Sequence, residues 1–292
     1  MNIVQIRAGL GNQMFQYAFY MALKQNQSDT KVDVSIFRYR PSHTGYELER
    51  LFGVHPDYAT IEERNQMADV GKDWLSECRR AIGWKRKTTG VLIQEPDPAK
   101  GWCPQLLHAE NCYIQGYWQT ENYFRPISER VKETFQFCLP LSSADQSILQ
   151  KIQSESSVSV HIRRGDYLKK RRRDEYEVCK EGYYKRAVEY IQNHVESPVF
   201  YVFSDEPEWG RKQNVFPTNT VFITGHTGSN AYIDMQLMSA CHHHIIANSS
   251  FSWWGAWLGE SADSIIVAPG VWFHHQPRPD VVPSRWIKID AD

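Results

Sequence analysis

Residues 1–37, MNIVQIRAGLGNQMFQYAFYMALKQNQSDTKVDVSIF, contain two short apolar runs separated by a glycine-containing break and a longer amphipathic stretch. Residues 1–7 predict a strand. Apolar side chains then recur at helical spacing up to about residue 25, which predicts a helix. Residues 31–37 alternate as a second strand does. A strand, a helix and a strand in succession are typical of a parallel sheet covered by helices.

The second half of the chain repeats this alternation of strands and helices. The expected strands are 158–162, 199–203, 221–223, 244–247 and 264–268, and the expected helices include 182–194, 231–240 and 252–258. Parallel strands joined by helices form a doubly wound sheet, which binds ligands at the carboxyl ends of its strands. The sequence therefore predicts an α/β protein with two parts, residues 1–150 and residues 151–292.

The intervening sequence is less regular. A strand is expected at 113–117, and helices at 121–137 and 145–154. Between residues 40 and 110 no clear periodicity appears, although residues 79–87 carry five basic side chains around Trp84.

Composition excludes several classes of protein. A formal net charge of −1 argues against general nucleic-acid binding, which requires a basic excess. We see no apolar run of the roughly 18 residues that a membrane helix needs, and no secretory signal. The six cysteines form no CxxC pair, so we expect free thiols and a cytoplasmic location.

The first candidate site is the loop Gly9-Leu10-Gly11-Asn12-Gln13. It resembles the beginning of a dinucleotide-binding fingerprint, with Asp33 as a ribose acceptor, but Met14 stands where the third glycine belongs. The alternative is that the amides of Asn12 and Gln13 hold sugar hydroxyls, because each amide offers a donor and an acceptor.

The second candidate site, HIRRGDY at residues 161–167, leaves the end of an expected strand. Alternation places His161 and Arg163 on the same face. A guanidinium at this position suits a phosphate, to which it presents paired donors. The plainer interpretation is a surface ion-pair cluster with Asp166. The basic run 169–173 that follows is either a solvated loop or a cover for an anionic donor.

The third candidate site, Asn248-Ser249-Ser250-Phe251-Ser252, lies between a strand and a helix. One serine suffices to cap a helix. Three hydroxyls and an amide exceed that need and favour phosphate binding at the helix N-terminus. The tryptophans that follow, at 253, 254 and 257, are expected in the core.

Two weaker candidates complete the set. Asp205 and Glu206 follow an expected strand and suit a purine edge or ribose hydroxyls, or else serve as a plain helix cap. The run of histidines at 242–244 suggests a metal, but neighbouring strand residues point to opposite faces and do not easily share one ion. We therefore expect no metal and no cofactor.

In order along the chain, GLGNQMFQYA, HIRRGDY and NSSFSWWGAWL resemble the bacterial α-1,2-fucosyltransferases of glycosyltransferase family eleven. The resemblance covers nearly the whole chain. It implies a GT-B-like architecture of two Rossmann-like domains facing across a cleft, with the acceptor on the N-terminal side. It also implies metal-independent, inverting transfer of L-fucose from GDP-β-L-fucose to the 2-hydroxyl of a terminal β-galactoside. Animal relatives carry a membrane anchor, whereas this chain resembles the bacterial type and is expected at a membrane only peripherally, if its acceptor is lipid-linked.

The resemblance also assigns roles to residues. Arg163 is expected to balance charge on the departing β-phosphate, and Asp166 is the first candidate for the general base, followed by acidic residues at 174, 175 and 177. The residues expected to bind the donor are His161, Arg164, Asp205, Glu206, Asn248, Ser249, Ser250 and Phe251. The residues expected to face fucose or the acceptor are Gly9, Gly11, Asn12 and Gln13, with Asn12 counted as catalytic.

Two other functions fit parts of the sequence. A non-catalytic carbohydrate or sugar-nucleotide binding protein would keep the aromatic pockets but has no need of Arg163 beside an anion site. A nicotinamide-dependent oxidoreductase rests on Gly9, Gly11 and Asp33 alone.

Overall fold

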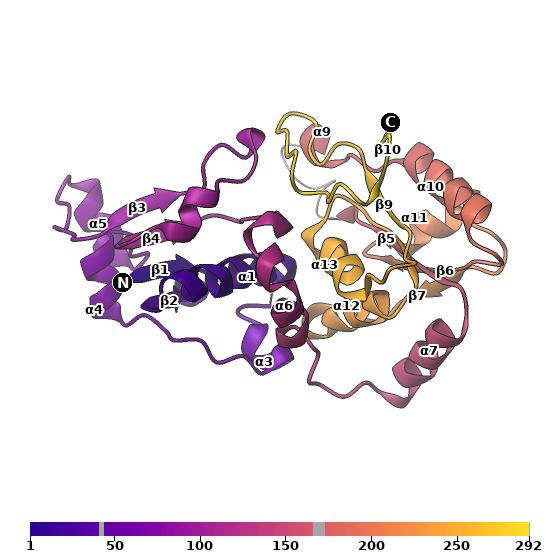
Figure 1. Cartoon of the computed structure of the whole chain (residues 1–292), viewed down its shortest axis with the longest axis horizontal. Helices are drawn as coiled ribbons and strands as arrows, with labels where there is room; N and C mark the ends of the chain where they lie inside the picture. Colours follow the sequence, from indigo (N-terminus) through magenta and orange to yellow (C-terminus); the bar gives the residue numbers. More distant parts are fainter. Residues whose placement is uncertain (41–43, 166–172, 292) are drawn as a thin grey trace. The chain divides into compact units, whose positions relative to one another are not determined.

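The computed structural model describes residues 1–40, 44–165 and 173–291. The chain divides into two compact units, Met1–Cys138 and Leu139–Asp292. This boundary lies before the predicted one at residue 150, because helix α7 (Ser143–Ser154) packs on strand β5 and helix α12 of the second unit. The predicted α/β class is confirmed, as is the GT-B-like pair of Rossmann-like units (Figure 1). The cleft expected between them stays a prediction.

The first unit contains a parallel sheet in the order β2-β1-β4-β3. Its strands are β1 (Asn2–Gln5), β2 (Thr30–Asp33), β3 (Val91–Gln94) and β4 (Cys112–Gln115). Its helices are α1 (Leu10–Asn26), α2 (Ile36–Tyr39), α3 (Leu48–Phe52), α4 (Ile61–Met67), α5 (Trp74–Ala81) and α6 (Ser128–Thr134), with 3-10 turns η1 (Pro98–Lys100), η2 (Pro104–His108), η3 (Glu121–Tyr123) and η4 (Arg125–Ile127).

Helix α1 is the centre of this unit because it is apolar on most sides and buried along most of its length. Phe19 on α1 stacks on the fully buried Trp118, with ring centroids 4.6 Å apart. Gln16, also buried on α1, accepts from the Arg7 backbone and donates to the Gly116 carbonyl at 2.9 Å. Helix α1 is thereby fixed to the segments that follow β1 and β4.

The second unit contains a parallel sheet in the order β10-β9-β8-β5-β6-β7. Its strands are β5 (Ser157–Ile162), β6 (Val199–Ser204), β7 (Val221–Ile223), β8 (His243–Ile245), β9 (Ile266–Pro269) and β10 (Ile287–Ile289). Besides α7 its helices are α9 (Arg173–Tyr176), α10 (Glu181–His194), α11 (Pro207–Lys212), α12 (Tyr232–Ser239) and α13 (Ser250–Gly259), with the 3-10 turn η5 (Gly228–Asn230).

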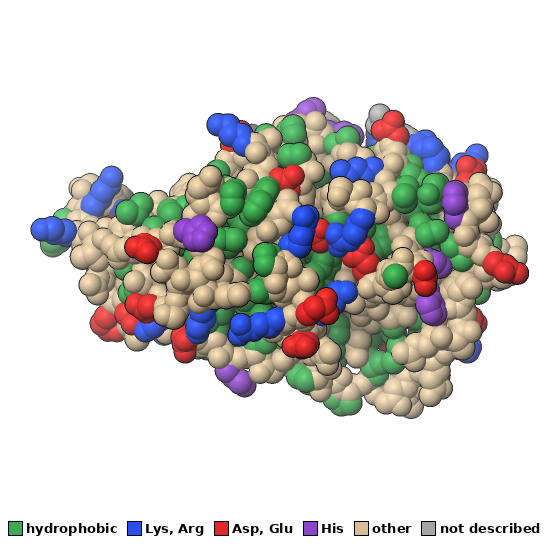
Figure 2. Space-filling model, in the orientation of Figure 1, with side chains coloured by type: hydrophobic (Ala, Val, Ile, Leu, Met, Phe, Trp, Pro, Cys, Tyr) green, Lys and Arg blue, Asp and Glu red, His purple; other side chains and the backbone are tan. Residues whose placement is uncertain are grey.

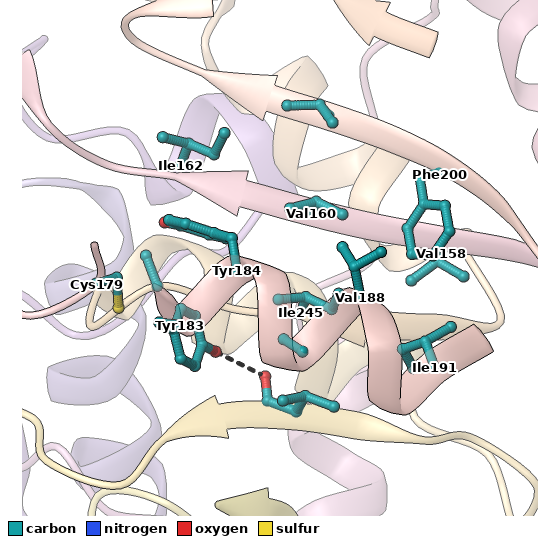
Figure 3. Packing of buried hydrophobic residues seen from close by; sticks show 14 of the residues in the cluster. Val158, Val160, Ile162, Cys179, Tyr183, Tyr184, Val188, Ile191, Phe200 and Ile245 are labelled. Atoms are coloured by element: carbon teal, nitrogen blue, oxygen red, sulfur yellow. Dashed lines mark hydrogen bonds between the residues drawn. The ribbon is translucent and has the colours of Figure 1, made fainter. Parts of the chain in front are cut away.

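The core of this unit forms where α10 packs on the sheet (Figure 3). Val160 and Phe200 on neighbouring strands are fully buried, as is Tyr183 on α10. The Tyr183 hydroxyl donates to the Ile246 carbonyl at 2.6 Å, with the Val267 carbonyl 3.4 Å away. Helix α10 is therefore held to the sheet by a polar contact as well as by apolar packing.

A partly buried histidine links α7 to α12 in the second unit. His226 Nδ1 lies 2.6 Å from Asp234 on α12, and His226 Nε2 lies 3.0 Å from Asp145 on α7. The hydrogen bond to Asp234, reinforced by Asp145, raises the pKa of His226 above its ordinary value. Since the fold favours the protonated imidazole, its contribution to stability is complete below a pH of about 6.5. That contribution is lost as the pH rises through the raised pKa.

We expect His226→Gln to lower the free energy of unfolding at pH 6 by about 1 to 2 kcal/mol, because a charge-assisted hydrogen-bond pair is lost. The difference from wild type should shrink as the pH rises above the pKa of the folded histidine. Urea unfolding across this pH range measures it, with the exposed His275→Gln as control. A difference that stayed constant with pH would contradict the charged state assigned to His226.

Candidate functional site

The strand order of the second unit indicates where a ligand site is expected. Counted from β5, the order is the 3-2-1-4-5-6 of Rossmann folds, and the direction of winding reverses between the neighbouring strands β5 and β8. In open parallel sheets a ligand binds at the carboxyl ends of the strands beside this reversal. The loops after Ile162 and Ile245 begin there, and they contain the second and third candidate sites.

The backbone of the loop after β5 is held by a carboxylate that follows the neighbouring strand. Asp205, which follows β6, accepts hydrogen bonds from the backbone N–H of Arg164 at 3.0 Å and of Gly165 at 3.1 Å. The same carboxylate lies 3.2 Å from Nη1 of Arg163, whose side chain is 30% exposed. Arg163 is therefore oriented and still accessible, as an anion-binding guanidinium must be. Asp205 was expected to face guanine or ribose; here it positions the arginine loop.

Arg164 is packed against the protein. Its guanidinium lies 4.3 Å from the ring centroid of Trp209 and 3.2 Å from the Glu177 carboxylate. Glu206 lies 3.7 Å from its Nε, and the Glu206 side chain stays 38% exposed. Arg164 was expected among the donor-binding residues; in this structure its side chain braces the loop. Trp209 was not among the sequence candidates, because it lies on α11 and nothing in the linear sequence links it to the arginine.

His161 is buried at the end of β5, and its backbone carbonyl accepts from the Tyr184 hydroxyl at 3.0 Å. Burial, with the positive charge of Arg163 adding to it, lowers the pKa of His161 to about 3, so the imidazole is neutral at physiological pH. Within the described part of the chain its Nδ1 has no hydrogen-bond partner. The ring lies 5.8 Å from that of Phe251. A buried polar atom without a partner, beside an aromatic ring, is suited to a ligand contact.

Helix α13 begins beside this histidine, and the three serines at its start have different roles. Ser249 caps the helix by accepting from the Phe251 N–H at 3.3 Å. Ser252 donates back to the carbonyls of Ala247 and Ser249. Ser250 is partly exposed and is the hydroxyl best placed for a ligand. The hydroxyls of Ser249 and Ser252 thus have partners within the protein. Of the three serines that were expected to bind phosphate, Ser250 is the one whose hydroxyl the helix start does not use.

Asn248 is buried and fixes the loop. Its amide donates to the carbonyls of Tyr176 and Trp272, both at 3.0 Å, and accepts from the Cys179 thiol. It was expected to contact the donor, but in this structure it connects the start of α13 to the end of α9 and to the segment that follows β9. The tryptophans at 253, 254 and 257 are buried, as predicted.

The loop Gly9–Gln13 of the first unit is built differently from the expectation. Gln13 is completely buried; its amide donates to the carbonyls of Ala8 and Gly45, each at 2.8 Å, and accepts from the Glu47 N–H. Gln13 therefore shapes the loop and does not reach a sugar in this arrangement. Asn12 is half-buried and accepts from the Gln119 side chain at 2.6 Å.

The two glycines of this loop do not supply its left-handed conformation. Gly9 caps α1 with φ −76°, Gly11 lies within the helix, and the positive φ of 68° falls on Ala8. Asp33, the ribose acceptor of the dinucleotide interpretation, is buried and bonded to Tyr113 and to the Ser35 N–H. Asp33 is therefore not available to bind a ribose, and the oxidoreductase interpretation lacks the acidic residue that it requires.

The remaining candidates differ in what the structure says of them. Asp166 and residues 169–172 of the basic run lie outside the described residues. The three histidines at 242–244 have separate partners. His242 pairs with Ser157 and His244 with Ser159, while His243 Nδ1 accepts from the Ile265 N–H.

A cavity of about 470 Å³, lined by both polar and apolar side chains, lies in the first unit at the carboxyl ends of β1 and β2. Gln5 and Asp33 end these strands, and Arg64, 3.3 Å from Asp33, also lines the cavity. Asn65 and Tyr39 also line it. Carboxylate, amide and guanidinium groups beside an aromatic ring are suited to hydroxylated ligands. This site was not predicted from the sequence, because one wall comes from strand ends near the N-terminus and the other residues come from the irregular segment 40–110.

A Rossmann-type sheet with an arginine loop and a helix N-terminus at its reversal point is typical of α/β proteins that bind nucleotides. The model of Glycosyl transferase family 11 matches residues 103–290. The chain belongs to this family, as predicted from its three sequence motifs.

Relatives support the assignment over the full chain. An alpha-1,2-colitosyltransferase of Escherichia coli is 32% identical, covering 99% of this chain and 98% of its own length. A galactoside alpha-(1,2)-fucosyltransferase 1 of Saimiri boliviensis boliviensis is 27% identical over 71% of this chain and 63% of its own. Among solved structures, the fucosyltransferase NodZ from Bradyrhizobium aligns with a TM-score of 0.48 at 12% identity, covering 87% of this chain and 91% of that one.

Proposed function

We propose that the chain is a galactoside 2-α-L-fucosyltransferase that transfers L-fucose from GDP-β-L-fucose to the 2-hydroxyl of a terminal β-galactoside, with inversion and without a metal. Family membership supports the reaction class, and the name of the Saimiri relative supports fucose and the galactoside. The observation that carries the proposal is Arg163, which is oriented by Asp205 at the carboxyl end of β5, next to the strand that leads into α13.

The reaction is a single displacement. The acceptor oxygen bonds to the anomeric carbon on the face opposite GDP. The bond from that carbon to the β-phosphate oxygen breaks, and its electron pair stays on the phosphate. Arg163 and the first N–H groups of α13 stabilise the negative charge that develops there. The neutral His161 and the ring of Phe251 hold the nucleotide.

A carboxylate takes the acceptor proton. Asp166 is the proposed base, since Glu177 is paired with Arg164 and acts in this arrangement as a brace.

The cavity at the ends of β1 and β2 is the proposed acceptor site. Its volume of about 470 Å³ suits one or two sugar rings. Ser35, Asn65 and Tyr39 in its lining are at least partly exposed, and their hydroxyl, amide and aromatic ring suit sugar hydroxyls and a sugar face.

A colitosyl donor is the second candidate. The 32% identity over almost the whole chain to a protein named as an alpha-1,2-colitosyltransferase favours it. Both donors would use the same arginine loop, so the choice depends on contacts to the sugar.

The test is GDP release from GDP-fucose in EDTA, with and without lactose, followed by mass spectrometry of the sugar. We expect lactose-dependent release and a product heavier by one fucosyl group. GDP-colitose run in parallel decides between the donors. If the protein binds GDP-fucose but releases no GDP with lactose or with any other galactoside, the non-catalytic binding function replaces the proposal.

A further inference from the structure

Helix α5 turns its apolar face to solvent. Trp74 is 73% exposed, Leu75 69%, and Ile82, which caps the helix, 77%. Trp84, two residues further on, is 70% exposed. Surface helices of globular proteins turn such a face inward. This segment does the opposite and presents two tryptophans to water.

The polar face of α5 is fixed to the protein. The Asp69 carboxylate accepts hydrogen bonds from the guanidinium of Arg79 at 2.9 Å and from that of Arg80 at 3.2 Å. The hydrogen bond from Arg79 holds the pKa of Asp69 well below its usual range. Ser76, on the same side, is 7% exposed. Arg79 also donates to the Trp84 carbonyl at 2.6 Å. The outward orientation of the apolar face is therefore built into the fold.

Basic side chains flank this apolar face. Residues 72–87 contain six Lys and Arg against two acidic residues, in a chain whose net charge is −1. Arg79 and Arg80 of the six pair with Asp69 on the polar face. Lys85, Arg86 and Lys87 lie next to Trp84 and are exposed. Figure 2 shows basic and hydrophobic side chains side by side at the end of the first unit where α5 lies.

We propose that this surface, formed by Trp74, Ile82, Trp84, Lys85 and Lys87 and hereafter called the α5 surface, binds the surface of an anionic lipid bilayer. Exposed aromatic and aliphatic side chains rimmed by Lys and Arg are typical of elements that lie at the headgroup boundary. The apolar groups enter the boundary region, and the basic groups attract anionic headgroups. Within the described ranges, no helix has both the length and the apolar character to span a bilayer, so attachment through α5 is peripheral.

Charge argues against a second copy of the chain as the occupant. A twofold dimer through the α5 surface would bring the same basic patch of both copies together, and like charges at close range oppose association. An anionic bilayer complements the basic residues and the tryptophans together.

The experiment is co-sedimentation with vesicles of phosphatidylcholine, alone or mixed with phosphatidylglycerol. We expect binding to the mixed vesicles that weakens with salt, and little binding to phosphatidylcholine alone. Lys85→Ser with Lys87→Ser should weaken binding about thirty-fold, whereas Lys212→Ser with Lys288→Ser, which are exposed lysines of the second unit, should leave it unchanged. Trp74→Ser, Ile82→Ser and Trp84→Ser together should abolish binding, whereas Val271→Ser should not.

Brominated lipids give a second readout. They should quench the tryptophan fluorescence of the wild type, and the variant lacking Trp74 and Trp84 should lose that quenching. All the substituted side chains are exposed, so circular dichroism should show an unchanged fold. Failure of the wild type to sediment with the mixed vesicles would overturn the proposal, and so would a dimer that the triple variant abolishes. Neither readout requires transferase activity, so failure here is distinguishable from failure of the proposed reaction.

Discussion

Arg163→Ala is expected to lower kcat by roughly 10² to 10³-fold or more while the fold stays intact, because it removes the charged donor assigned to the leaving diphosphate. The side chain is 30% exposed and belongs to a loop, so its loss leaves no cavity in the core. Arg163→Lys keeps the charge but loses the paired donors, and its activity should lie between those of wild type and Ala.

The measurement is GDP release at saturating donor and acceptor, with thermal unfolding of each variant. Arg211→Ala is the matched control, since Arg211 is an exposed arginine of the same unit whose carboxylate partner is the neighbouring Glu208. Activity of Arg163→Ala above about a tenth of wild type would show that the leaving group is stabilised elsewhere, because a tenfold loss corresponds to only about 1.4 kcal/mol.

The position of Arg163 at a strand end could be predicted from the sequence, because the strands of a Rossmann sheet are buried on both faces and are therefore easy to recognise. Strand β6 is such an apolar run, whereas β5 alternates Ser or His with Val or Ile although all its residues are buried; the predicted bounds of both strands agree with the structure within a residue. The loops that leave them follow from the general rule for parallel sheets. By contrast, the edge strand β3 was missed, since its exposed Val91 and Leu92 show no alternation between a buried and a polar face.

The expected helix 121–137 was wrong in extent. Pro126 has no N–H to donate, and its ring disfavours a helical conformation in the preceding residue. The chain therefore makes two 3-10 turns before α6 begins at Ser128.

Side-chain partners were the least predictable feature. Gln13 was read as a sugar contact because amides suit hydroxyls, yet its acceptor is used by Glu47, 34 residues away in sequence. Asn248 similarly bonds to a carbonyl 72 residues away. Such partners are determined by the tertiary fold, so residue type and local pattern predict the loop but not which of its side chains remain accessible.

Asp205→Ala is expected to lower kcat by roughly 10²-fold, although Asp205 need not touch either substrate. Its carboxylate accepts two backbone N–H groups and pairs with Arg163, so one side chain fixes both the loop and the guanidinium. Losing this carboxylate lets Arg163 leave the productive geometry, and catalysis by a preformed charge is sensitive to such displacement.

Asp205→Asn should be nearly as damaging as Ala. The amide offers one oxygen where the loop presents two N–H donors, so its NH₂ group would face a second donor. Gly165 leaves little room for adjustment, since a Cβ there would already lie 3.2 Å from the Asp205 oxygen.

Kinetics can separate this positioning role from the nucleotide contact that sequence alone suggested. If Asp205 positions the loop, kcat falls in both variants and the KM for GDP-fucose changes little. If it binds guanine or ribose, that KM rises while kcat is retained, and the positioning role is wrong. Glu208→Ala, three residues further on and 77% exposed, is the control and should match the wild type in both constants. Because Arg163 remains present in the Asp205 variants, a fall in kcat there would mean that its orientation, in addition to its charge, is required.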